Sequence, residues 1–151
     1  EVLDEIKEGV DVSFIWVGSA DSCDHDQVLD EFHVGPFPTG ANEFHLDCSP
    51  PNPKLVPDSD VLGVTVLLIS FSYCGEQFLK VGYYVQTAYF DDDLNANATP
   101  QNIHYDMLGR NLLMSKPAIT PSAIECGTVL PPMKNRNIQG ISKQETNGNH
   151  A

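Results

Sequence analysis

Segments rich in β-branched and aromatic residues recur along this chain, and clusters of Gly, Pro, Asn and Asp separate them. An all-β sandwich has this pattern, whereas a fold that alternates helices and strands does not. We therefore predict strands at residues 11–18, 28–34, 41–48, 63–73, 77–87 and 118–124.

Turn and breaker residues divide these predicted strands. Residues 35–40 contain two Gly and two Pro and predict one hairpin turn, and residues 74–76 predict another. The prolines of 50–53 cannot continue a strand interior, so they mark a long loop. One short helix is expected at 104–114, where three apolar residues fall at helical spacing.

The hairpin predicted for 63–73 and 77–87 has apolar residues on both of its faces. By alternation, one face carries Thr65, Leu67, Ile69, Phe71, Leu79, Val81, Tyr83 and Val85. The other face carries Val64, Val66, Leu68, Phe78, Lys80, Gly82 and Tyr84. An antiparallel sheet normally buries one face and exposes the other, so the second face needs a cover from the chain itself or from a partner.

Carboxylates are available around this second face. Asp21, Asp24 and Asp26 lie in one predicted loop, and Asp58 and Asp60 lie in another. An apolar centre ringed by charge is typical of a protein interface. The alternative is that residues 91–114 cover the apolar residues and that the acids are solvated loop residues. The pattern alone leaves both interpretations open.

The composition fits one domain. The chain has 151 residues, of which 41% are hydrophobic, enough for one core of ordinary size. From Gly127 the sequence is rich in Asn, Gln, Gly, Lys and Ser and has too little apolar surface to offset its ordering entropy. We predict a folded core at 1–126 and a disordered tail at 127–151.

The charge is strongly acidic. Eight Lys and Arg stand against 21 Asp and Glu, a formal net charge of -13, which repels nucleic acid and anionic lipid and attracts basic partners. No apolar run approaches the length of a membrane span, and Glu1–Glu8 lacks a signal-peptide pattern. We expect a soluble, intracellular protein.

Candidate chemistry is sparse. Phosphate-binding loops, nucleophile elbows and H-E-x-x-H motifs are absent from the sequence, so no catalytic residue is assigned. Cys23 with His25 and His45 with Cys48 offer zinc-type ligands, but at irregular spacing, so no metal site and no cofactor is assigned. The four cysteines form no C-x-x-C pair, which favours free thiols. The triplet at 97–99 matches a glycosylation acceptor and supports a secreted alternative.

Several motifs resemble the anti-silencing function family of histone chaperones in order and spacing. They are Val17-Gly18-Ser19-Ala20, Asp26-Gln27-Val28-Leu29-Asp30, Val34-Gly35-Pro36, Gly63-Val64-Thr65-Val66, Val81-Gly82-Tyr83-Tyr84-Val85, Arg110-Asn111-Leu112-Leu113 and Lys116-Pro117. The resemblance covers about residues 1–120, and several motifs in one order are far more specific than any single motif. It implies an immunoglobulin-like β-sandwich that binds the dimer of histones three and four in the nucleus. It also implies that the protein delivers this dimer to chromatin-assembly factors.

The resemblance also implies which residues bind. Those matching the contact with histone three are Val17, Ala20, Val64, Val66, Leu68 and Tyr84, with Asp26, Asp60 and Lys80 as charged contacts. Those matching an edge that receives the tail of histone four as an added strand are Val81, Leu113 and Thr120. Those matching a second surface, for short peptides of assembly factors, are Glu8, Asp30, Phe32, Val34, Pro36 and Phe44. We expect a monomer without direct contact to nucleic acid or membrane.

The chain departs from the family pattern at several points. It begins inside that pattern, so we expect the family's amino-terminal strand to be missing. Cys23 and Gly9 stand where the family has acids, and Ala118 stands where it has an arginine, which predicts weaker interfaces. Two alternatives remain: a secreted immunoglobulin-like adhesion or receptor domain with disulfides, and a small zinc- or calcium-dependent enzyme.

Overall fold

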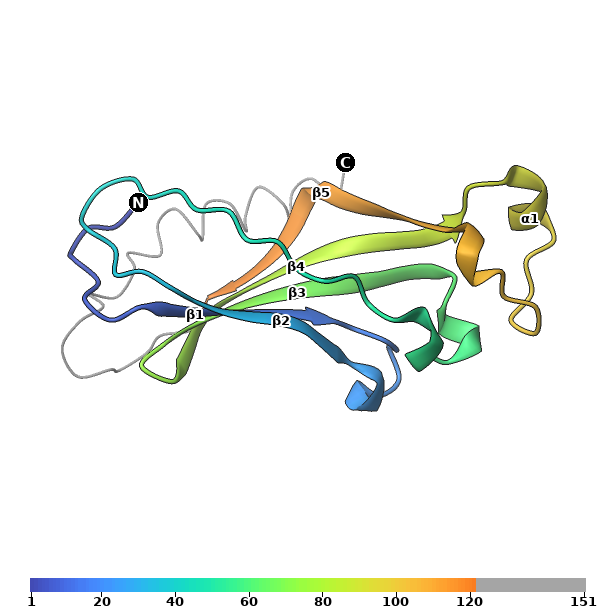
Figure 1. Ribbon diagram of the computed structural model, residues 1–151, viewed down its shortest axis with the longest axis horizontal. Helices are drawn as coiled ribbons and strands as arrows, with labels where there is room; N and C mark the ends of the chain where they lie inside the picture. The colour runs from blue at the N-terminus through green and yellow to red at the C-terminus, as the bar shows by residue number, and fades with distance from the viewer. Residues whose placement is uncertain (122–151) are drawn as a thin grey trace.

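A computed structural model describes residues 1–121 of the chain, and these residues form one five-stranded antiparallel sheet (Figure 1). The strands are β1 (Val10–Trp16), β2 (Gln27–Val34), β3 (Gly63–Tyr73), β4 (Glu76–Tyr89) and β5 (Leu108–Pro121). Their order across the sheet is β2-β1-β3-β4-β5. The single α-helix of residues 1–121, α1 (Asp92–Ala96), is short and lies at the end of the sheet opposite the N-terminus. The predicted all-β class is confirmed, and the sheet is consistent with the predicted sandwich.

The long β3–β4 hairpin is the centre of the sheet. Its two-residue turn consists of Cys74 at φ 50° and Gly75 at φ 82°. Two successive left-handed residues match the twist of the flanking strands, which is why such turns close tight hairpins. The turn sets the pairing of Tyr73 with Glu76, and the predicted hairpin is confirmed here.

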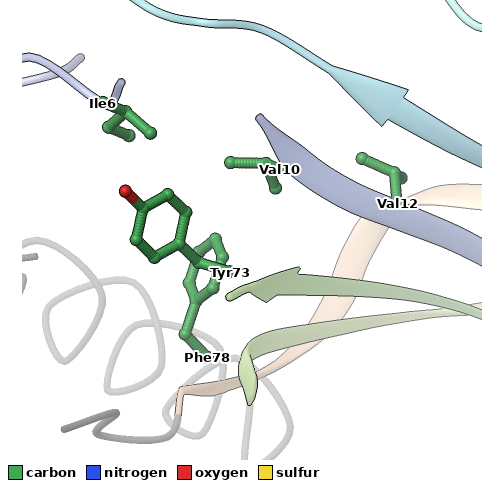
Figure 2. Close-up of a cluster of buried hydrophobic side chains, with 5 residues drawn as sticks. All are labelled: Ile6, Val10, Val12, Tyr73 and Phe78. Atoms are coloured by element: carbon green, nitrogen blue, oxygen red, sulfur yellow. The ribbon is translucent and has the colours of Figure 1, made fainter. Parts of the chain in front are cut away.

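One face of the sheet, the inner face, is buried and carries Val10, Val12, Trp16, Tyr73 and Val85, each 6% exposed or less. Figure 2 shows its main cluster, in which Ile6, Val10, Val12, Tyr73 and Phe78 pack together. Phe37 and Leu46 pack against this cluster from the segment that follows β2. That segment crosses the sheet before β3 and covers part of the inner face (Figure 1).

The inner face is closed differently at the end nearer α1. The guanidinium of Arg110 lies 5.4 Å from the ring centroid of Trp16, and its Nη2 donates to the carbonyl oxygen of Pro51 at 3.4 Å. Burial lowers the pKa of Arg110. Val56 and Val61, on either side of the 3-10 turn η3 (Asp58–Asp60), are buried beside them.

Three sequence-based predictions of elements are wrong. Residues 104–114 are not a helix. A 3-10 turn, η4 (Tyr105–Met107), leads into β5, because residues 108–113 find partners along the edge of β4. Residues 41–48 are not a strand, because within residues 1–121 no neighbouring strand pairs with them. Residues 35–40 do not form the predicted hairpin turn, because no strand in the described part of the chain follows them to pair with β2. Instead, two isolated bridges join Val2 to Gly40 and Ile6 to Phe37.

Phe78 also differs from its predicted position on the second face of the hairpin. The β3–β4 register shifts between Phe71 and Ser72, where Leu79 and Gln77 are the partners, so Phe78 is the extra residue of a β-bulge. A bulge re-aims the side chain of its extra residue. Phe78 is therefore 9% exposed within the core cluster.

The predictions for the C-terminal region extend past the described residues. The strand expected at 118–124 begins ten residues earlier, at Leu108. The disordered tail at 127–151 and the boundary at residue 126 lie outside the described residues. Over residues 1–121, the structure contains no helix with the length and apolarity of a membrane span.

Candidate functional site

The outer face of the β3–β4 hairpin carries a solvent-exposed apolar patch. We define the outer patch as Val64, Val66, Leu68, Tyr84 and Leu113. Val66 pairs with Tyr84, and Tyr84 pairs with Leu113 on β5, so these side chains share one face. Val64 is 64% exposed, Tyr84 48% and Leu113 40%. The alternative in which residues 91–114 cover this face is therefore wrong.

Gly82 lies at the end of the patch, in the same row of paired residues as Leu68. It pairs with Leu68 on one side and with Ala118 on the other. A Cβ atom on Gly82 would lie 3.2 Å from Val66 Cγ1 and 3.4 Å from Leu68 Cδ2. The glycine thus leaves room for the branched side chains of β3 above it, and a larger residue would have to displace them.

The patch continues into a groove at the end of the sheet nearer α1. The groove has a volume of about 290 Å³. Its lining includes Val17, Ala20, Asp60, Val64 and Val66, all predicted site residues. The amide of Val17 donates to the carbonyl of Val66 at 3.0 Å, and the Thr65 hydroxyl donates to the carbonyl of Val17. These bonds extend the β1–β3 pairing to the rim of the groove.

Gly18 allows an acidic turn to pack against the strand end. A Cβ there would lie 2.1 Å from the carbonyl oxygen of His25, so a side chain at this position would displace the 3-10 turn η1 (Cys23–His25). Ser22 caps the turn by accepting a hydrogen bond from the amide of Asp24 at 3.1 Å. Asp24 and Asp26 are both exposed on this turn, in agreement with a charged rim.

Asp58 and Asp60, the two acids of the η3 turn, have different surroundings. Tyr105 donates its hydroxyl to Asp58 Oδ1 at 3.2 Å. Burial, followed by this bond to Asp58, raises the pKa of Tyr105. Asp60 is half-buried and lines the groove, where its amide donates to the carbonyl of Pro57 at 2.8 Å. Asp58 therefore anchors residues before β5, whereas Asp60 faces the candidate site.

The predicted edge residues do not all share one face. Thr120 pairs with Lys80, and Lys80 pairs with Ser70, so both lie on the outer face with the patch. Val81 pairs with Ile69 and Ile119 and lies on the inner face. Within residues 1–121, β5 pairs only with β4, so its other edge is open to an added strand.

The residues predicted for a second surface lie at the opposite edge of the sheet. Phe32 of β2 packs against Phe14 with ring centroids 6.0 Å apart, and Phe44 packs against Phe37 at 5.6 Å. Asp30 Oδ2 accepts a hydrogen bond from the amide of Ser49 at 2.7 Å, which ties β2 to the segment that covers the inner face. The others are Glu8, exposed before β1, and Val34 and Pro36, which lie at and beyond the end of β2.

A polar groove that the sequence pattern did not predict lies on the outer face, at the end away from α1. Its lining includes Asp11, Glu31, His33, Ser70 and Ser72. His33 Nδ1 lies 2.7 Å from Asp11 Oδ1, and a Cβ on Gly9 would lie 2.2 Å from His33 Nε2. The alternating Asp11 and Ser13 of β1 were the signal for a polar outer face there.

Cysteines and metal-type ligands form no site in the described part of the chain. Cys23 and Cys74 are exposed and Cys48 is half-buried, and none of the three is in a disulfide. Burial, followed by the charge of Asp30, raises the pKa of Cys48. Among residues 1–121, no three His, Cys, Asp or Glu side chains gather as a metal site requires. Cys126 lies outside the described residues.

Comparison with known proteins agrees with the motifs. The profile of the family described as ASF1 like histone chaperone matches residues 1–126. Over 120 residues, 80% of this chain, the chain is 42% identical to histone chaperone asf1 of Drosophila melanogaster and to histone chaperone ASF1 of Saccharomyces cerevisiae. It spans 55% and 43% of their lengths, less than two thirds in each case. The chain belongs to the ASF1-like family of histone chaperones.

Proposed function

We propose that this chain binds the dimer of histones three and four through the outer patch and the adjoining groove. We further propose that it delivers the dimer for nucleosome assembly and disassembly in the nucleus, without catalysis. The observation that carries the proposal is the pairing of Val66 with Tyr84 on an exposed face beside Asp60. An apolar centre with a charged rim is the usual anatomy of a protein interface.

The charge of the chain favours a basic partner of this kind. A net charge of -13 attracts a basic protein and repels a second copy of the chain. Asp26 and Asp60 would orient the encounter, while Val66 and Tyr84 would supply most of the affinity as buried hot spots.

Two further contacts belong to the same proposal. The open edge of β5, next to Leu113 and Thr120, suits an extended segment such as the tail of histone four, added as a strand. Val81 would contribute to this edge only from the inner face. Short peptides of chromatin-assembly factors would bind at the β2 edge, near Phe32 and Phe44.

Calorimetric titration of the whole chain with the dimer of histones three and four, at physiological salt, tests the proposal. We expect one-to-one binding that Val66→Arg abolishes, because a charge in the patch would have to be buried without a partner. The matched control is Leu3→Arg, which places the same charge at an apolar residue that is 61% exposed in the N-terminal segment. Equal affinities for wild type and Val66→Arg would place the interface elsewhere.

A further inference from the structure

The most exposed large apolar side chain among the described residues is Phe90, directly after β4, at 79% exposure. Its amide donates to the carbonyl of Met107 at 3.1 Å, which fixes the backbone where the chain leaves the sheet. One edge of its ring lies over Gly109, where a Cβ would be 2.7 Å from Phe90 Cε1. Phe90 therefore has a defined position on the sheet although most of its surface faces water.

Phe90 lies on the same face as the outer patch. Gly109 pairs with Ala88, and two residues further along each strand Asn111 pairs with Gln86, which in turn pairs with Val64. Paired residues share a face, so the Cβ direction of Gly109, and with it the ring of Phe90, is on the outer side. The adjacent residue, Tyr89, points inward and is 5% exposed.

Protection of the Gly109 backbone explains only part of why the Phe90 ring lies where it does. An aromatic ring over a glycine at a sheet edge can protect the backbone there. That role uses one side of the ring, whereas 79% of the residue stays in contact with water. An exposed aromatic residue on the same face as an apolar patch is typical of an interaction surface.

We propose that Phe90 is a further apolar contact for the histone dimer and extends the outer patch along β4 and β5 toward α1. This inference rests on the function proposed above. The position of Phe90 on the same face, one row of paired residues beyond Val64, favours the same partner. Charge favours it over a second copy of this chain, because Phe90 is followed by the exposed acids Asp91, Asp92 and Asp93 and the whole chain carries -13.

Calorimetric titration of Phe90→Ala with the dimer of histones three and four tests the contact. We expect the dissociation constant to rise about fivefold, less than for a central residue, because peripheral contacts are worth less than buried ones. The matched control is Leu3→Ala, which removes an apolar side chain that is 61% exposed in the N-terminal segment, outside both proposed binding surfaces. Its histone affinity should stay within about twofold of wild type, and thermal unfolding of both variants gives the effect on the fold.

A second variant separates contact from stability. Phe90→Trp keeps a ring over Gly109 and adds an exposed indole to a chain whose one tryptophan, Trp16, is 6% exposed. Acrylamide should quench the added fluorescence in the free protein and quench it at least about threefold less in the complex. The quenching of wild type, free and bound, gives the background from Trp16.

The outcomes distinguish this inference from the proposed function. If Val66→Arg abolishes binding but Phe90→Ala binds like wild type and the added indole stays accessible in the complex, the inference is wrong and the proposed function stands. If wild type does not bind the histone dimer at all, both are wrong. Weaker binding by Phe90→Ala together with protection of the indole supports both.

Discussion

Tyr84 and Val85 are neighbours on β4, yet their surroundings are opposite. Val85 is 2% exposed on the inner face, whereas Tyr84 is 48% exposed on the outer face beside Val66. The inner face is closed by residues of the same chain, such as Arg110 over Trp16. The outer face is equally apolar at its centre and has no such cover within residues 1–121. The contrast indicates that one set of side chains stabilises the fold and the other is available to a partner.

Among the side-chain truncations, removal of the Tyr84 side chain should have the largest effect on histone binding and little effect on stability. Tyr84→Ala should weaken histone binding about 30-fold, equivalent to about 2 kcal/mol for a central aromatic contact. Its melting temperature should change little, because about half of the residue already faces water. Calorimetry and thermal unfolding measure the two effects. A large loss of stability with unchanged affinity would reverse the assignment of the outer face.

Truncation of Val85 should have the converse effect. Val85→Ala removes two buried methyl groups and should lower the free energy of unfolding by about 2 kcal/mol. Urea unfolding followed by circular dichroism measures this change. Histone affinity of the folded variant should remain near wild type. If the affinity falls as much as in Tyr84→Ala, the two faces are not independent.

Substitution of an acid in the charged rim should have a smaller effect on histone affinity. Asp60→Asn should weaken histone binding about threefold at low salt, with the difference disappearing near 0.5 M salt, where the Debye length is about 4 Å. Asp4→Asn, at an exposed acid of the N-terminal segment, is the matched control and should have less effect. An equal effect of the two substitutions would mean that Asp60 acts only through the net charge.

The smallest expected effect is on the thiol reactivity of Cys48, which lies in the segment that covers the inner face. Cys48 lies in the segment tied to β2 by the bond between Ser49 and Asp30, and burial raises its pKa. Because the thiolate is the reactive form, a raised pKa leaves less of it at pH 8. Cys48 should therefore react with a thiol reagent at least about threefold more slowly than the exposed Cys23, as measured by mass spectrometry of the labelled peptides. Equal rates would show that this cover opens readily.

Much of the sheet was predictable because its signals are local. Alternation of apolar residues located β3 and β4 and assigned Val66 and Tyr84 to one face, and Cys74 and Gly75 located the turn between the strands. The residue order of the motifs was also sufficient to identify the family, since it requires no geometry.

Elements that depend on a neighbouring strand were not predictable in this way. Residues 104–114 have helical spacing, but 108–113 pair with β4, because a strand ladder outweighs a weak helical preference. Residues 41–48 alternate like a strand but have no strand beside them within residues 1–121, so they stay irregular. Phe78 entered the core through a bulge, which no single-strand pattern contains.

The sequence by itself determined the class of fold, the acidic character and the two-faced central hairpin, because composition and alternation are properties of the chain alone. Only the tertiary structure decided which apolar face is covered, because cover depends on segments distant in the sequence. It also decided which residues meet: Val17, Asp60 and Val66 around one groove, and Phe90 over Gly109. Strand register sets these contacts, and register depends on long-range pairing.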